Sequence, residues 1–196
     1  MIKDFVKKKL LHVEKGHDYQ HALRVEKYAL ILQSKEGGDK NIIKNSALIH
    51  DVIDSKFTNE SKALEKVKKI LKQNKIKNIN EIINIIKNIS FRKKYKGKKS
   101  LEFQIVQDAD MLDAIGAIAI ARSFHFGGYK NRPLHDPNIK IDPNYKETTT
   151  INHFHEKLLL LKDRLNTKTA KKIAESKHQF MLKFLEEFQK DWDVEY

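Results

Sequence analysis

Residues 41–53 read NIIKNSALIHDVI, and this stretch decides the fold. Its apolar residues recur at helical spacing, so we predict a helix that packs one face into a hydrophobic core. His50 and Asp51 interrupt the apolar pattern at positions where burial is expected. An imidazole and a carboxylate are nitrogen and oxygen donors of the kind that divalent transition metals take. The pair is therefore a candidate for part of a metal site.

A second imidazole donor, His21, lies in the segment GHDYQHALRV at 16–25. We expect a helix to begin there after the glycine, with Asp18 as its N-cap. At helical spacing, one face of this helix carries four polar side chains: His17, His21, Arg24 and Tyr28.

A further carboxylate is expected from the helix around residue 110, where Asp108, Asp110 and Asp113 compete for the ligand role. Spacing places Asp110 and Asp113 on one face and rotates Asp108 away, so it does not choose between the first two. Small residues that follow, from Ala114 to Ala121, would let a neighbouring helix approach closely and bring ligands together.

Imidazoles and carboxylates together suit Mn, Fe, Ni, Co or Zn, whereas Mg prefers oxygen donors alone. If such a site keeps an open coordination position, its default chemistry is hydrolysis of a phosphate or acyl bond. Asp54 lies four residues after His50, about one helical turn further on. Its carboxylate would be close enough to act on a water held at the site.

The sequence resembles the HD superfamily of metal-dependent phosphohydrolases, whose signature is a histidine, an adjacent His-Asp pair and a distant Asp. The resemblance covers nearly the whole chain and is specific to one bacterial subfamily. It rests on these segments: GHDYQHALRV (16–25), LIHDVIDSKF (48–57), ISF (89–91), QDADMLDAIGA (107–117), IARSF (120–124), Gly127-Gly128, HFHEKL (153–158) and Asn166-Thr167.

The resemblance implies an all-α, HD-domain helical bundle and four metal ligands: His21, His50, Asp51 and Asp110. It also implies Asp54 as the acid/base carboxylate and Lys56 as a phosphate contact, with Asp113 supporting a ligand or the packing of its helix. We expect His17, Arg24 and Arg122 to bind the substrate as well. Met111 departs from the subfamily, which usually has a basic residue there, so the substrate contact or salt bridge that the basic side chain would supply is not assigned here.

The subfamily resembles nucleoside triphosphate pyrophosphohydrolases that prefer Mn²⁺, so the expected partner is a nucleotide, most simply a (deoxy)nucleoside triphosphate. A 5′-nucleotidase or a cyclic-nucleotide phosphodiesterase is the alternative within the same chemistry. A basic nucleic-acid-binding module with a structural metal is the alternative of another class. It predicts a closed site with four protein ligands and salt-sensitive binding.

Composition is consistent with one domain over 1–196, since 40% hydrophobic residues suffice for one core. There are no cysteines, which favours a reducing cytoplasm and excludes a thiolate site. Residues 1–15 are lysine-rich and lack a signal-peptide core. The longest apolar run, Ala114 to Ala121, is far shorter than the ~20 residues of a membrane span, so we expect a soluble protein.

The net charge of +13 and the basic loop 91–100 invite a nucleic-acid interpretation. We favour a solvated loop, because only five of the 39 basic residues are arginine and lysines occur throughout the chain. Nucleic acid is therefore not an expected partner, although the same field would attract anionic nucleotides.

The pattern predicts helices at 2–14, 17–36, 39–53, 58–73, 78–90, 100–124, 151–165 and 168–190. A long irregular loop is expected near 126–150, either as a lid over the pocket or as a packed surface excursion. As a lid it would offer a nucleotide five side chains: His125, Tyr129, Lys130, Arg132 and His135. His153 and His155 lie on different helix faces, which disfavours a second metal. A monomer and a homodimer both remain open.

Overall fold

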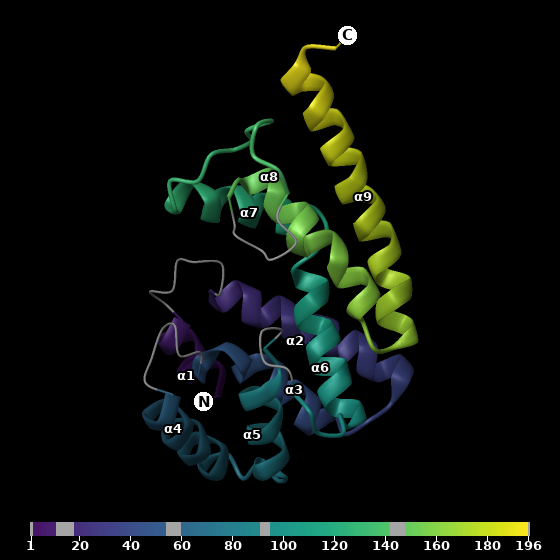
Figure 1. The fold of residues 1–196 in the computed structure, drawn as a ribbon. Helices are drawn as coiled ribbons and strands as arrows, with labels where there is room; N and C mark the ends of the chain where they lie inside the picture. The colour runs from purple at the N-terminus through teal and green to yellow at the C-terminus, as the bar shows by residue number, and fades with distance from the viewer. Residues whose placement is uncertain (1, 11–17, 54–59, 91–94, 142–147, 196) are drawn as a thin grey trace. The chain divides into compact units, whose positions relative to one another are not determined.

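The computed structural model describes residues 2–10, 18–53, 60–90, 95–141 and 148–195. These residues form helices joined by turns and loops, and no strand occurs among them, so the all-α fold class is confirmed (Figure 1). The chain divides into two compact units, residues 1–110 and 111–196. The interpretation of 1–196 as one domain stays a prediction.

The first unit contains α1 to α5 and most of α6. Its helices are α1 (Ile2–Leu10), α2 (Tyr19–Glu36), α3 (Lys40–Ile49), the 3-10 helix η1 (His50–Ile53), α4 (Glu60–Gln73), α5 (Ile79–Asn88) and α6 (Leu101–Asp113). Helix α3 packs between α2 and α5, and α4 packs on α5 and η1. The core is aliphatic: Ala29, Leu32, Ile43, Ile49, Leu71, Ile82 and Ile85 are fully buried.

Helix α3 lies in the core of this unit, and most of its residues are buried. The helical spacing of its aliphatic residues predicts this burial. Asp39 begins it, accepting hydrogen bonds from the amides of Asn41 and Ile42 at 2.8 and 3.1 Å. At its other end the chain tightens into η1, which carries His50 and Asp51. The predicted helix 39–53 is therefore confirmed, with a 3-10 last turn.

The second unit contains α7 (Ala117–Tyr129), α8 (Thr150–His153), a π-helix η2 (Phe154–Leu158), the 3-10 helix η3 (Leu159–Arg164) and α9 (Lys168–Asp193). An aromatic cluster joins α7, η2 and α9, with ring centroids 5.8 to 6.3 Å apart. Its members are Phe124, Phe154, Phe184 and Phe188. The helical spacing of phenylalanines in the last helix predicts core packing; Phe184 and Phe188 are half-buried in this cluster, whereas Phe180 is 53% exposed.

The prediction of one continuous helix at 100–124 is wrong, because the chain turns at residues 114–116 between α6 and α7. Gly116 has φ +85° and ψ −164°, a conformation that only glycine adopts without strain. The side chain of Lys177 packs over this turn, and its Nζ donates to the carbonyl oxygen of Ile115 at 2.8 Å. The small residues expected to permit close approach of a helix therefore include Gly116, whose backbone forms part of the turn between α6 and α7.

Gly116→Ala is expected to lower the free energy of unfolding by about 1 to 3 kcal/mol. The alanine would have to adopt a positive φ that is disfavoured for it, and its Cβ would lie 3.2 Å from Cβ and Cγ of Lys177. Gly128→Ala is the matched control, because Gly128 is helical and a Cβ there would meet nothing within 4 Å. That change should leave stability unaltered or raise it by up to about 1 kcal/mol. Urea denaturation followed by circular dichroism measures both, and equal stabilities of the two variants would contradict this account.

The predicted loop near 126–150 begins later than expected, since α7 continues to Tyr129. Several of its side chains pack on aromatic rings within the second unit. The His135 ring lies 5.0 Å from the Trp192 ring, and Lys130 and Arg132 lie over the Phe126 ring at 5.9 and 5.8 Å. These contacts agree with a packed surface excursion. The lid function stays a prediction, and residues 142–147 lie outside the described part of the chain.

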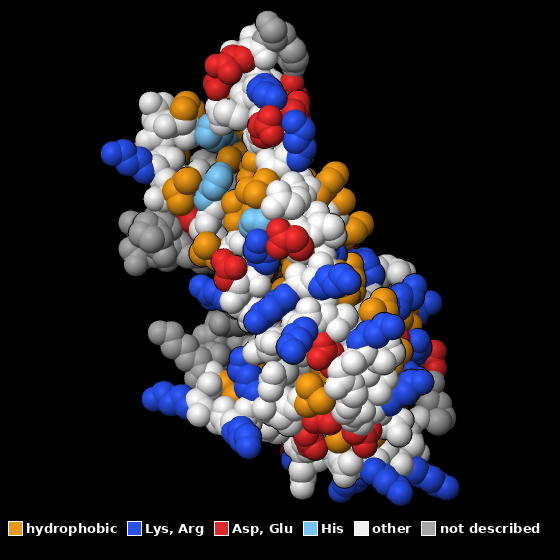
Figure 2. All heavy atoms as spheres, turned by 90° about the vertical axis from the view of Figure 1, so that its right-hand side faces the viewer, with side chains coloured by type: hydrophobic (Ala, Val, Ile, Leu, Met, Phe, Trp, Pro, Cys, Tyr) orange, Lys and Arg blue, Asp and Glu red, His pale blue; other side chains and the backbone are white. Residues whose placement is uncertain are grey.

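Lysine and arginine side chains are spread over the face drawn in Figure 2, with aspartate and glutamate among them. On α9, for example, Lys183 and Lys190 both pair with Glu186 and Glu187. This distribution agrees with solvated charged surfaces. Among the described helices, none is long and apolar enough to cross a membrane.

Candidate metal centre

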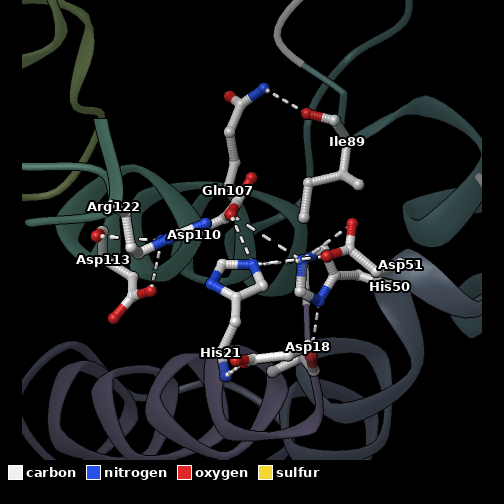
Figure 3. A network of polar contacts seen from close by, with 10 residues as sticks. Asp18, His21, His50, Asp51, Ile89, Gln107, Asp110, Asp113 and Arg122 are labelled. Atoms are coloured by element: carbon white, nitrogen blue, oxygen red, sulfur yellow. Dashed lines mark hydrogen bonds and ion pairs between the residues drawn. The ribbon is translucent and has the colours of Figure 1, made fainter. Parts of the chain in front are cut away.

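Four side chains from three segments of the first unit converge on one point (Figure 3). They are His21 in the first turn of α2, His50 and Asp51 in η1, and Asp110 in α6. Nε2 of His21 lies 3.3 Å from Nε2 of His50, 3.3 Å from Oδ2 of Asp51 and 3.4 Å from Oδ1 of Asp110. The structure thus brings together all four residues expected as metal ligands.

The His50 ring completes the cluster. Its Nε2 lies 3.3 Å from Oδ1 of Asp51 and 3.7 Å from Oδ1 of Asp110. The ring of His50 stands at 68° to that of His21, with centroids 5.2 Å apart, so both Nε2 atoms point into the same space. Even without Asp110, the ligand atoms of His21, His50 and Asp51 lie close enough together to hold a metal ion.

Local structure fixes both imidazoles. Asp18 caps α2 by accepting a hydrogen bond from the His21 amide at 2.7 Å, as its N-cap spacing predicted, and this sets the first turn that carries the ring. On the other ring, Nδ1 of His50 lies 2.7 Å from the carbonyl oxygen of Ala47. A carbonyl oxygen only accepts, so Nδ1 of His50 is the protonated nitrogen.

The consequence is that a neutral His50 ring directs an Nε2 lone pair at two carboxylates. Lone pairs that face carboxylate oxygens at 3.3 to 3.7 Å repel one another unless a cation lies between them. Two neutral imidazoles and two carboxylates are also the donor set that Mn, Fe, Co, Ni or Zn prefers. The chemistry of the donors therefore fits a divalent transition metal.

Burial shows from which side the site is reached. His21, His50 and Asp51 are nearly inaccessible, at 1, 4 and 8% exposed, whereas the Asp110 side chain is 31% exposed. Burial raises the pKa of the Asp110 carboxyl, but its electrostatic interactions with the nearby His21 and His50 side chains outweigh this and hold the pKa below its usual range. Asp110 is thus a carboxylate at the accessible edge of the cluster.

The other expected site residues are placed as follows. Arg24 lies one turn after His21 on α2 and is half-buried. His17, Asp54 and Lys56 lie outside the described residues, and their roles stay predictions. Sequence analysis did not single out Gln107, one turn before Asp110 on α6, whose amide Nε2 donates to the Ile89 carbonyl at 3.2 Å (Figure 3). The spacing of three residues between Gln107 and Asp110 is the signal that could have found it.

Asp113 and Arg122 form a buried ion pair in the second unit. NH1 of Arg122 donates to Oδ2 of Asp113 at 2.7 Å and to its backbone carbonyl at 3.3 Å. The Asp113 side chain is only 2% exposed. Spacing alone could not choose between Asp110 and Asp113 as the metal ligand, and this ion pair gives Asp113 a different role. Asp113 therefore stabilises the junction between α6 and α7. Binding of substrate by Arg122 stays a prediction.

Arg122→Met is expected to lower the free energy of unfolding by about 3 kcal/mol, because it leaves a buried carboxylate without its cation. Arg164→Met is the control, since Arg164 is an exposed arginine of the same unit and should cost less than about 1 kcal/mol. Urea denaturation gives both values. A stable Arg122→Met protein with a raised KM would instead assign this side chain to substrate binding.

Comparisons with known proteins agree on one family. The HD domain family matches residues 18–115, half of the chain. YpgQ of Bacillus subtilis is 38% identical over 97% of this chain and 91% of its own length. The crystal structure of an HD-superfamily hydrolase from Bacillus thuringiensis is 40% identical, with a TM-score of 0.82 over 99% of this chain and 96% of that one. YpgQ crystallised in complex with ADP has a TM-score of 0.79 at 34% identity, over 97 and 95% of the two chains.

Proposed function

Since this chain belongs to the HD-domain superfamily and is a metal-dependent phosphohydrolase, we propose that its substrate is a (deoxy)nucleoside triphosphate and its cofactor Mn²⁺. Water would add across the bond between the α- and β-phosphates, giving a nucleoside monophosphate and pyrophosphate. The convergence of His21, His50, Asp51 and Asp110 carries the proposal, because these donors leave an accessible edge at Asp110.

A nucleotide substrate is supported by the ADP complex of YpgQ, a relative that matches this chain over nearly its whole length. ADP carries the phosphoanhydride bond that the proposed reaction cleaves in a triphosphate. The net charge of +13 also favours the approach of a polyanion.

In the proposed site, the two imidazoles and two carboxylates hold the divalent cation. When bound, the cation supplies Lewis acidity toward a phosphate oxygen and makes a water more acidic. Asp54 follows η1 directly, and we assign it to take a proton from the attacking water and to return one to the leaving group. Lys56, Arg24 and His17 are assigned to the phosphate oxygens, where cationic groups offset the charge that develops.

The test is turnover of a nucleotide panel by the purified protein with Mn²⁺, Ni²⁺, Co²⁺ and Mg²⁺ in turn. Release of pyrophosphate from triphosphates, fastest with Mn²⁺, is the expected result. Orthophosphate from monophosphates would indicate a 5′-nucleotidase, and a linearised product from cyclic nucleotides would indicate a phosphodiesterase. The His50→Ala protein serves as the blank, so that a contaminating phosphatase is recognised.

A further inference from the structure

Lys99 differs from the other described lysines of the basic loop because its ammonium group is held in place. Lys96 and Lys98 are exposed, whereas Lys99 is half-buried. Its Nζ donates to Oε1 of Gln107 at 2.7 Å and lies 5.8 Å from the centre of the Phe103 ring. The Phe103 ring is itself stacked on Tyr95 at 5.1 Å. An aromatic face and an amide oxygen therefore fix this cation.

Gln107 connects this ammonium group to the helix that carries Asp110. Its Nε2 donates to the Ile89 carbonyl, which leaves its Oε1 to face Lys99. Gln107 and Asp110 are neighbours three residues apart on α6, with Cβ atoms about 5 to 6 Å apart. Figure 3 shows the Gln107 side chain leaving the helix beside Asp110 and reaching Ile89. Lys99 is thus hydrogen-bonded to the turn of α6 that also carries Asp110, the accessible ligand.

The charge of the four-donor centre explains why a cation such as Lys99 would be useful to substrate binding. The carboxylates of Asp51 and Asp110 neutralise a divalent cation, so the four-donor centre adds no net positive charge for a substrate with several negative phosphates. A triphosphate therefore needs further cations near the accessible edge of the cluster. Lysine binds phosphate as a point charge and needs no bidentate geometry.

We propose that Lys99, positioned by Gln107 and Phe103, binds a phosphate of the substrate other than the one that reacts. The proposal rests on the function proposed above and deepens it, because it makes Lys99 a determinant of preference for polyphosphate chains. The solvated loop inferred from composition then contains one residue that is part of the substrate site.

The test compares Lys99→Met with Lys98→Met, an exposed lysine one residue away. With a nucleoside triphosphate and Mn²⁺, Lys99→Met should raise KM by about tenfold or more, the usual value of a hydrogen bond to a charged group. Its kcat should stay close to wild type, because the lost contact is made equally in ground and transition states. Lys98→Met should match wild type, and Lys99→Arg should restore most of the affinity.

A second substrate separates this proposal from the proposed function. Bis(p-nitrophenyl) phosphate has one phosphorus and no polyphosphate tail, so its kcat/KM should be the same in wild type and Lys99→Met. An unchanged KM for the triphosphate, or an equal loss with both substrates, would overturn the role of Lys99 while leaving the function intact. Turnover of the diester without turnover of any nucleotide by wild type would overturn both. Thermal unfolding checks each variant, and Lys99→Gln replaces Lys99→Met if the latter does not fold.

Discussion

His50→Ala is expected to reduce kcat/KM for the proposed nucleotide substrate by more than about 10³-fold at saturating Mn²⁺, because a centre that loses one of two imidazoles loses the cation or its geometry. His50 is buried and its Nδ1 is hydrogen-bonded to the Ala47 carbonyl oxygen, so its Nε2 is held facing the other three donors. Steady-state kinetics gives the loss in rate, and elemental analysis of the purified protein gives the metal content.

His178→Ala is the matched control for this histidine, since His178 lies on α9, outside the unit that carries the cluster. Its activity and metal content should equal those of wild type. A His50→Ala protein that retains both metal and turnover would refute the assignment of His50 as a ligand, and with it the four-donor centre.

Asp54→Ala is expected to lower kcat by about 10²- to 10⁴-fold while the protein keeps its metal, the usual range for loss of a general acid or base. Asp54 comes directly after η1, whose Asp51 faces the two histidines. The measurement pairs kcat with metal content, as for His50, and adds the pH dependence of kcat.

Asp54→Asn keeps the size of the side chain and removes its ability to take a proton, so it should lose as much activity as Asp54→Ala. The acidic limb of the pH profile should disappear in both variants. Full activity of either variant with bound metal would show that another group moves the proton.

Sequence alone predicted the parts of the site that depend on local pattern. His50 and Asp51 stand out because they interrupt an apolar face, and the structure buries them there. Asp18 was identified as a cap from its position before the helix, and it does cap α2. In both cases the information lies within a few residues, where helical periodicity determines which side chains share a face.

The choice between Asp110 and Asp113 could not be made this way, because they lie on one face of the same helix. What separates them is Arg122, nine residues after Asp113, and that pairing depends on the turn at Gly116. The turn could not be predicted from the small residues at 114–121, because alanines and a glycine are compatible with a continuous helix as well as with an interrupted one. The turn between α6 and α7 thus allows an ion pair that spacing along one helix could not predict.

The separation of the donors along the chain links metal affinity to folding. His21 and His50 are 29 residues apart, and Asp110 is supplied by a third helix, so an unfolded chain offers no comparable chelate. A cation that binds only the native arrangement acts as a thermodynamic clamp, worth about 2.7 kcal/mol at a concentration one hundred times its dissociation constant. Metal supply in the cell would then regulate how much of this protein persists, as well as how fast it works.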